Sequence, residues 1–339
     1  MSLPPTSYLQ FTPDLRITRI LNGMWQVSGA HGTIDPQAAV KAMFAYHDTG
    51  FTTWDLADHY GPAEDFVGAF RRRVAAERGE EAVAGIQAFT KWVPRPGPIT
   101  RQSVEDAVAT SLRRMGVERL DLLQFHWWDY GNPAYLDTLS HLADLQQQGK
   151  IRHLALTNFD AEHLRLIVER GIRIVSNQIQ YSLIDRRAQI RMAAFCQEHG
   201  IHLLAYGALG GGLLSEKYLW RNEPGKAALT TASLIKYKQV VDTWGGWELF
   251  QELLITLKRV AERHGVSIAN VAVRYVLDCP EVAGVIVGAR LGVAEHIADT
   301  ARVFTLQLDD ADRAQIEATL AQGADLYQLI GDCGDEYRR

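Results

Sequence analysis

The chain has 339 residues, of which 47% are hydrophobic and 22% are charged. This composition is typical of a globular protein with a large core, and it excludes a disordered or fibrous chain. Asp and Glu (40 residues) outnumber Lys and Arg (35 residues), and the net charge of -5 provides no basic surface that would attract nucleic acid. We therefore expect no nucleic-acid partner.

The amino-terminal residues and the cysteines indicate the cellular compartment. Residues 1–10 have neither the basic region nor the apolar stretch of a signal peptide, and no part of the chain has the roughly 18 uninterrupted apolar residues of a membrane span. Cys196, Cys279 and Cys333 lie far apart, and an odd number of cysteines at such spacing does not describe a disulfide framework. We expect a cytoplasmic protein that is not embedded in a membrane.

The first predicted elements are a hairpin and a helix. Residues 8–11 and 15–18 flank a Thr-Pro-Asp turn and are expected to pair as a β-hairpin. A helix should follow Asp35, because Asp35 is a good N-cap, Pro36 suits the first helical position and Gly50 provides a stop. From about residue 20 to residue 304, short apolar runs then alternate with longer segments of helical period, which is typical of a parallel α/β fold.

Eight extended runs occur in this alternation, and each precedes a helical stretch. They are residues 20–25, 51–55, 83–91, 120–126, 151–158, 174–180, 201–206 and 282–287. No Pro-, Gly- or Ser-rich linker divides them, so we predict one domain, a single (β/α)8 TIM barrel over about 20–304 followed by a helix and tail over about 309–339. A doubly wound sheet is the alternative.

Two segments lack a clear period. Residues 214–247, after the seventh strand, contain Pro224, Gly225, Gly245 and Gly246, and we predict that they form one long irregular connection. Residues 322–339 are expected to run over the surface of the barrel.

Ionisable side chains stand where several of the predicted strands end. Asp55, Lys91 and His126 end the second, third and fourth runs, and Tyr60 follows Asp55 by five residues. Active sites of TIM barrels lie at the carboxyl ends of the strands. A tyrosine needs a cationic neighbour to act as an acid near neutral pH, and Lys91, kept charged by Asp55, could lower the pKa of Tyr60. His126 could then donate a hydrogen bond to a carbonyl oxygen.

The segments around these residues resemble the aldo-keto reductase family. The resemblance is carried by WDLADHYGPAEDFVG at residues 54–68, TKW at 90–92 and LLQFHW at 122–127, and it extends over about residues 15–320. It implies that an aldehyde or ketone is reduced to an alcohol by hydride transfer from a nicotinamide cofactor. It also implies that the family's catalytic tetrad falls on Asp55, Tyr60, Lys91 and His126, with Tyr60 as the proton donor.

The resemblance further implies binding residues for cofactor and substrate. Thr157, Asn158 and Gln178 match the residues that bind the nicotinamide carboxamide, and Tyr206 matches the ring under the nicotinamide. The whole implied cofactor set is Gly23, Thr157, Asn158, Gln178, Tyr206, Gly207, Leu209, Gly210, Gly211, Lys217, Gly288 and Arg290. Because the guanidinium of Arg290 is suited to a 2'-phosphate, we expect NADPH to be preferred over NADH.

Aromatic residues indicate the class of substrate. Trp25 and Trp127 match the family positions that line the substrate pocket, and large rings favour planar or apolar carbonyl compounds over open-chain sugars. The chain departs from the usual family pattern at Leu56, where Thr is common, and at Thr300, where Asn is common. These departures leave the adenine contacts open.

Two other functions are compatible with parts of the sequence. A metal-dependent barrel hydrolase could use His59 and His126, although no HxH or HExxH spacing supports a metal site. A cofactor-binding regulatory or sensor protein on the same fold is the second alternative, since the potassium-channel beta subunits resemble this family. Turnover of carbonyl compounds distinguishes an enzyme from such a sensor.

Overall fold

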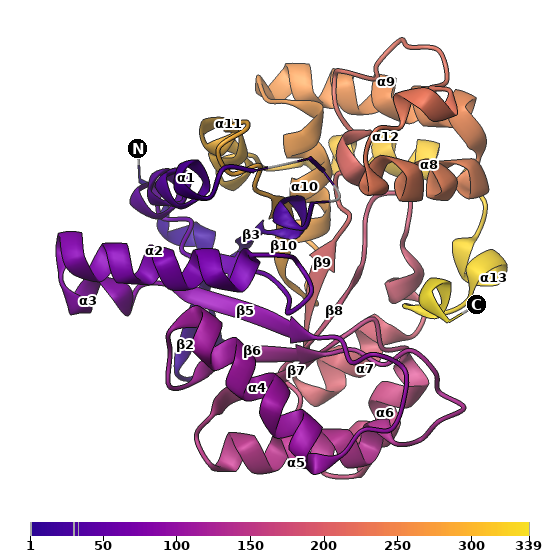
Figure 1. The fold of residues 1–339 in the computed structure, drawn as a ribbon. Helices are drawn as coiled ribbons and strands as arrows, with labels where there is room; N and C mark the ends of the chain where they lie inside the picture. The colour runs from indigo at the N-terminus through magenta and orange to yellow at the C-terminus, as the bar shows by residue number, and fades with distance from the viewer. Residues whose placement is uncertain (1, 30, 33, 339) are drawn as a thin grey trace.

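The computed structural model describes residues 2–29, 31–32 and 34–338. Figure 1 shows parallel strands surrounded by helices, and the strands close into a barrel in the order β10-β3-β4-β5-β6-β7-β8-β9. Their bounds are β3 (Ile20–Gly23), β4 (Thr53–Asp55), β5 (Gln87–Trp92), β6 (Leu120–Phe125), β7 (Ile151–Thr157), β8 (Ser176–Gln180), β9 (His202–Tyr206) and β10 (Val282–Gly288). The predicted (β/α)8 TIM barrel is therefore confirmed.

The amino-terminal hairpin is also confirmed. Strands β1 (Tyr8–Thr12) and β2 (Leu15–Thr18) pair antiparallel, with Leu9 opposite Ile17. Phe11, Leu15 and Ile17 are buried in one apolar cluster with residues from inside the barrel, among them Phe89 of β5. The hairpin thus adds its apolar face to the barrel interior.

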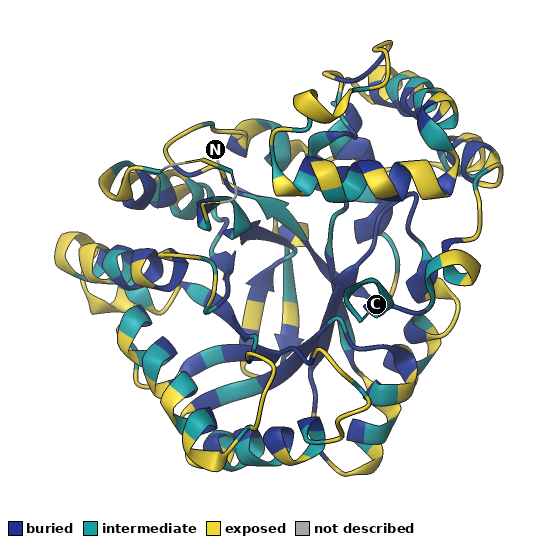
Figure 2. Cartoon of the chain, turned by 45° about the vertical axis from the view of Figure 1, so that its right-hand side comes forward, coloured by how far each residue is buried: buried dark blue, intermediate teal, exposed yellow. Residues whose placement is uncertain are grey.

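Helices pack around the outside of the strands. Figure 2 shows the buried faces of these helices turned towards the barrel and the exposed faces turned away from it. The helices are α1 (Pro36–Thr49), α2 (Ala63–Arg78), α3 (Glu80–Val83), α4 (Arg101–Met115), α5 (Tyr135–Gln147), α6 (Ala161–Glu169), α7 (Met192–His199), α8 (Ala232–Trp244), α9 (Gly246–His264), α10 (Ile268–Leu277), α11 (Ile297–Ala301), α12 (Asp310–Leu320) and α13 (Leu326–Ile330). None of these described helices has the length and hydropathy of a membrane span.

Helix α1 begins and ends where its sequence predicts. The Asp35 carboxylate accepts a hydrogen bond from the Ala38 backbone N–H at 2.6 Å, Pro36 is the first helical residue, and Gly50 ends the helix with a left-handed φ of 109°. Such a cap satisfies a backbone donor that has no partner within the helix. The local sequence therefore determines this element without help from distant residues.

Two predicted segments differ from the structure. The third run does not begin at Val83, because residues 80–83 form α3 and the strand β5 starts at Gln87. Residues 214–247 are not one long loop, because α8 occupies 232–244, with the Thr231 side chain as its N-cap. Leu234, Val241 and Trp244 bury one face of α8, and this amphipathic pattern is hidden between the irregular flanks.

The carboxyl-terminal tail is the third difference. After α13 the chain does not run over the surface: Asp332 and Cys333 are buried, and Tyr337 lines the cavity at the mouth of the barrel. In Figure 2 the carboxyl end lies in front of the barrel strands. Ion pairs between residues far apart in sequence hold the tail there, as described below.

Candidate active site

The cavity at the mouth of the barrel contains the four predicted catalytic side chains. It has a volume of about 1130 Å³ and is lined by Asp55, Tyr60, Lys91 and His126, among others. Asp55 is the last residue of β4, Lys91 is the penultimate residue of β5, and His126 directly follows β6. Parallel neighbouring strands bring these ends together, since Asp55 is in register with Phe89, and Lys91 with Gln124.

A buried ion pair forms the floor of the site. The Lys91 ammonium donates to both carboxylate oxygens of Asp55, at 2.8 and 2.7 Å, and to the Leu56 carbonyl oxygen at 3.0 Å. Both charged side chains are only 4% exposed. Burial lowers the pKa of Lys91 from its ordinary value, and the Asp55 carboxylate opposes that shift. Gln178 and Gln124 also donate to Asp55 Oδ1, at 2.6 and 3.0 Å, so the pair is held by neutral donors as well.

Tyr60 lies above this pair, but its pKa moves in the opposite direction from the prediction. The Lys91 Nζ atom is 5.1 Å from the centre of the Tyr60 ring, and the Trp25 ring packs edge-on at 5.0 Å. Burial raises the pKa of Tyr60, and the Asp55 carboxylate raises it further. The expected lowering by Lys91 is absent because all three ammonium donors are directed to Asp55 and Leu56, and Asp55 balances the charge. The phenol is therefore protonated at neutral pH.

His126 presents a hydrogen-bond acceptor to the cavity rather than a donor. Its Nδ1 atom is 3.1 Å from the Thr157 carbonyl oxygen, which can only accept, so Nδ1 carries the proton. Burial lowers the pKa of His126 to about 4, and the ring is neutral near pH 7. Nε2 consequently has a lone pair, and it is buried without a partner among the described residues. In this tautomer and charge state Nε2 accepts, so the predicted donation from His126 to a carbonyl oxygen would need Nε2 to be protonated.

The predicted cofactor residues line the same cavity, with one exception. Gly210 does not line it; this residue is buried, and its N–H donates to the Gly207 carbonyl oxygen. Asn158, which has a left-handed φ of 59°, accepts a hydrogen bond from the Tyr206 hydroxyl at 2.7 Å. The predicted cofactor residues that line the cavity are Gly23, Thr157, Asn158, Gln178, Tyr206, Gly207, Leu209, Gly211, Lys217, Gly288 and Arg290.

The side chains of these predicted cofactor residues suit the chemical groups of a nicotinamide dinucleotide. The amides of Asn158 and Gln178 and the flat ring of Tyr206 suit an aromatic carboxamide, whereas the exposed cations of Lys217 and Arg290 suit phosphate groups. The cavity volume also leaves room for a small second molecule. The amides of Asn158 and Gln178 are paired inside the protein here, so a carboxamide would have to replace or share those hydrogen bonds.

Comparison with known proteins agrees with this arrangement. The model of the Aldo/keto reductase family matches residues 19–321. The chain belongs to the aldo/keto reductase family. It is 27% identical over 344 residues to L-glyceraldehyde 3-phosphate reductase of Escherichia coli (strain K12), covering 94% of this chain and 93% of the relative. It is 24% identical over 325 residues to NADH-specific methylglyoxal reductase of the same organism, with 89% and 94% covered.

A solved structure of glycerol dehydrogenase from Gluconobacter oxydans superposes with a TM-score of 0.76 and 25% identity, covering 94% of this chain and 96% of that one. A thermostable aldo-keto reductase, Tm1743, superposes with a TM-score of 0.70 and 23% identity over 92% of this chain and 99% of its own, a likeness of fold. Membership of the family makes this reductase an NAD(P)H-dependent oxidoreductase that acts on small carbonyl compounds.

The tryptophans of the reductase are arranged differently from the prediction. Trp25 lines the cavity as expected, but Trp127 does not: it is 5% exposed, and its indole N–H donates to the Asp129 and Asn132 carbonyl oxygens. Trp128, 38% exposed, lines the cavity instead and packs edge-on against His126 at 4.4 Å. The strand ends at Phe125, so the alternation of sides along it does not determine where these two rings point.

The histidines of the metal-dependent alternative have other partners. His59 Nδ1 lies 2.8 Å from the Asp58 carboxylate, and His126 Nδ1 is bonded to the backbone. Within residues 2–29, 31–32 and 34–338, no group of three or more His, Cys, Asp or Glu side chains could hold a metal ion.

Several residues that form the far wall of the cavity, opposite the buried ion pair, were not identified from the sequence. Tyr337 of the tail places its hydroxyl 3.0 Å from that of Tyr206, and Lys236 of α8 donates to the Tyr337 hydroxyl. Tyr237 and His31 also line the cavity. The amphipathic pattern of α8 could have indicated Lys236, but the tail carries no periodic signal that would place Tyr337.

Proposed function

We propose that the chain reduces an aldehyde or ketone to an alcohol with NADPH, and that Tyr60 donates the proton to the carbonyl oxygen. One observation carries the proposal: the protonated phenol of Tyr60 lies above the buried Lys91–Asp55 pair, in the cavity that the candidate nicotinamide residues also line. A neutral phenol beside a fixed ammonium can release a proton when negative charge develops on a nearby oxygen.

The role of each side chain follows from its environment. When bound, the nicotinamide cofactor supplies the hydride that reaches the carbonyl carbon. Tyr60 gives its proton to the carbonyl oxygen, and the phenolate left behind lies beside the Lys91–Asp55 pair, with Lys91 Nζ 5.1 Å from the ring centre. Asp55 keeps Lys91 charged and oriented in spite of its burial. Nε2 of His126 accepts the hydrogen bond of the new alcohol hydroxyl and so orients the product.

Tyr60→Phe tests the proton donor. The variant keeps the ring but removes the hydroxyl, and we expect turnover to fall by about 100- to 10,000-fold while the dissociation constant for NADPH changes by less than about twofold. Tyr8→Phe is the matched control, because Tyr8 lies in the amino-terminal hairpin and its hydroxyl donates to Gly50. More than about half of the wild-type turnover in Tyr60→Phe, with chemistry rate-limiting, would refute the assigned role. Tight cofactor binding by the wild type without turnover of any carbonyl compound would favour the sensor alternative.

The preference for NADPH rests on Arg290. Its exposed guanidinium lines the cavity just beyond β10 and makes no ion pair with a carboxylate in the described part of the chain, so it is available to a 2'-phosphate. We expect a lower dissociation constant for NADPH than for NADH in fluorescence titrations, and loss of that difference in Arg290→Ala. Arg119→Ala, at an exposed position that does not line the cavity, is the control. Equal constants for both cofactors in the wild type contradict the proposal, and one relative is indeed named NADH-specific.

A further inference from the structure

The cavity is lined by a lysine, Lys236, that has no carboxylate within ion-pair distance among the described residues. Lys236 Nζ lies 4.5, 5.0 and 5.4 Å from the ring centres of Tyr337, Tyr206 and Tyr237, and it donates to the Tyr337 hydroxyl. Its charge reaches the Glu336 carboxylate through space: burial raises the pKa of Glu336, but Arg187 and, less strongly, Lys236 lower it below the ordinary value. Lys238, two residues further along α8, differs in this respect, since it pairs with both Glu223 and Asp242.

The surroundings of Lys236 leave it able to bind a ligand. An ammonium has three N–H donors, and the Tyr337 hydroxyl accepts one of them. The three rings attract the cation through their faces but cannot neutralise it, and they reduce its contact with water. A half-buried charge in this situation is stabilised most by an anion that brings oxygen acceptors.

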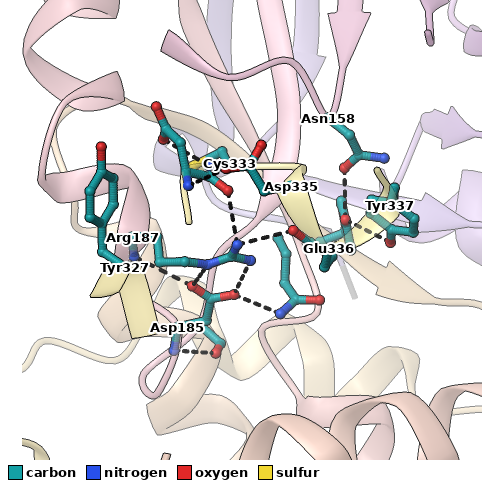
Figure 3. Close-up of polar contacts among 12 residues, drawn as sticks. Asn158, Asp185, Arg187, Tyr327, Cys333, Asp335, Glu336 and Tyr337 are labelled. Carbon is teal, nitrogen blue, oxygen red and sulfur yellow. Dashed lines mark hydrogen bonds and ion pairs between the residues drawn. The ribbon is translucent and has the colours of Figure 1, made fainter. Parts of the chain in front are cut away.

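Tyr337 is held in place by a buried network, so this arrangement is preformed. The Arg187 guanidinium forms two hydrogen bonds of 2.9 Å with the Asp185 carboxylate, and these side chains are 2% and 0% exposed. Arg187 also donates to Glu336 and to the Asp332 carbonyl oxygen, both at 3.0 Å. Figure 3 shows how this network fixes the tail immediately before Tyr337.

The cation is also close enough to the reacting end of the cavity to contact the same small molecule. The Tyr337 ring neighbours both groups: its centre is 6.1 Å from that of His126 and 4.5 Å from Lys236 Nζ. His126 and Lys236 both line the cavity, as does Trp128, which packs on His126. Tyr60, His126 and Lys236 therefore line one cavity, in which a single small molecule could contact all three.

We propose that Lys236 and Tyr337 form a subsite for an acid group, a carboxylate or phosphate, carried by the carbonyl substrate. Lys236 binds the acid group, and Tyr337 positions the Lys236 ammonium through its hydroxyl. This inference rests on the proposed function and narrows its substrate class to aldehydes and ketones with an acidic group on the side opposite the carbonyl.

The test compares 4-carboxybenzaldehyde with methyl 4-formylbenzoate, which have similar size but differ in charge; the ester withdraws electrons more strongly, so intrinsic reactivity works against the expected preference. We expect the wild type to favour the carboxylate by at least about tenfold in kcat/KM, and Lys236→Met to lose that preference. Lys236→Arg should restore it, and Tyr337→Phe should retain only part of it. Lys226→Met, which removes an exposed lysine that does not line the cavity, is the matched control for the ratio. If Lys236→Met does not fold, Lys236→Gln replaces it.

The outcomes separate the two proposals. If the wild type turns over neither aldehyde, the proposed function is wrong. If it turns over both and the ratio is near one, or is the same in Lys236→Met, the subsite alone is wrong. The subsite is also wrong if Lys236→Met leaves the ratio unchanged but raises the dissociation constant for NADPH about tenfold, because the anion bound by Lys236 is then a cofactor phosphate.

Discussion

Lys91 and Lys236 face the same cavity with different electrostatic consequences. The charge of Lys91 is balanced by Asp55, and burial together with that carboxylate raises the pKa of Tyr60. Lys236 directly contacts aromatic rings and a hydroxyl, and its charge reaches the Glu336 carboxylate only through space. At the scale of single residues, the sequence therefore predicts which side chains lie in the site better than it predicts their charge state. The charge state depends on neighbours from other parts of the chain.

The buried His126 predicts a dependence of stability on pH. Its folded-state pKa, about 4, lies below the ordinary value of 6.5, so between these values the unfolded chain binds a proton that the folded chain does not. The free energy of unfolding must therefore fall as the pH is lowered through this window, by about 3 kcal/mol for this one group. In urea titrations near pH 7 and near pH 4, His126→Gln should show a decline smaller by about that amount. An identical decline in both proteins would mean that His126 is protonated in the folded state.

The adjacent tryptophans provide a second prediction at this scale. Trp127→Ala removes a buried ring and should lower the free energy of unfolding by about 3–5 kcal/mol. Trp128→Ala should cost much less stability, but it should raise KM for aromatic aldehydes, because Trp128 is the ring that lines the cavity. Urea titrations and steady-state kinetics on both variants check the pair. A larger effect on KM from Trp127→Ala would restore the original assignment of Trp127 to the pocket.

At the scale of elements, Gly68 determines how closely α2 approaches α4. A Cβ atom at this position would lie 2.2 Å from the Arg114 carbonyl oxygen of α4, which as a backbone atom cannot move aside easily. Gly to Ala within a helix is normally stabilising by about 1 kcal/mol, but here the clash should reverse the sign and cost about 1–3 kcal/mol. Gly225→Ala is the control, since its φ is -66° and no atom lies within 4 Å of the added Cβ. Equal stability of Gly68→Ala and the wild type, measured by urea unfolding, would show that the two helices can separate at little cost.

Elements were predictable where short-range chemistry determines them. The Asp35, Pro36 and Gly50 signals act within one helix, and the strand ends at Asp55, Lys91 and His126 follow from apolar runs of ordinary length. The tail was not predictable, because its position depends on contacts such as Arg187 with Glu336, 149 residues apart. The same reason explains the failure to find Tyr337. Asp55 and Lys91, in contrast, lie on strands whose register the barrel fixes, and His126 directly follows a strand.

At the scale of the whole molecule, the candidate site is assembled from nearly the full length of the chain. The candidate tetrad lies within the first 126 residues, the candidate cofactor residues extend from Gly23 to Arg290, and the far wall includes Tyr337. The barrel closes by pairing its last strand with its first, where Val285 is in register with Ile20. The acid–base residues and the anion subsite are therefore joined only through long-range contacts.

This closure of the barrel determines when, during synthesis, the chain can form its complete fold. A ribosome releases β3 to β6, with Asp55, Lys91 and His126, long before β10 exists to pair with β3. Until then the strands form at most an open sheet whose apolar inner face, including Leu21 and Phe89, is unprotected. Apolar surface exposed in this way promotes aggregation. Contacts that span so much sequence also form slowly, which prolongs the exposure. A chaperone that shields the open sheet should therefore increase the yield of folded protein, while the free energy of unfolding of the finished barrel stays the same.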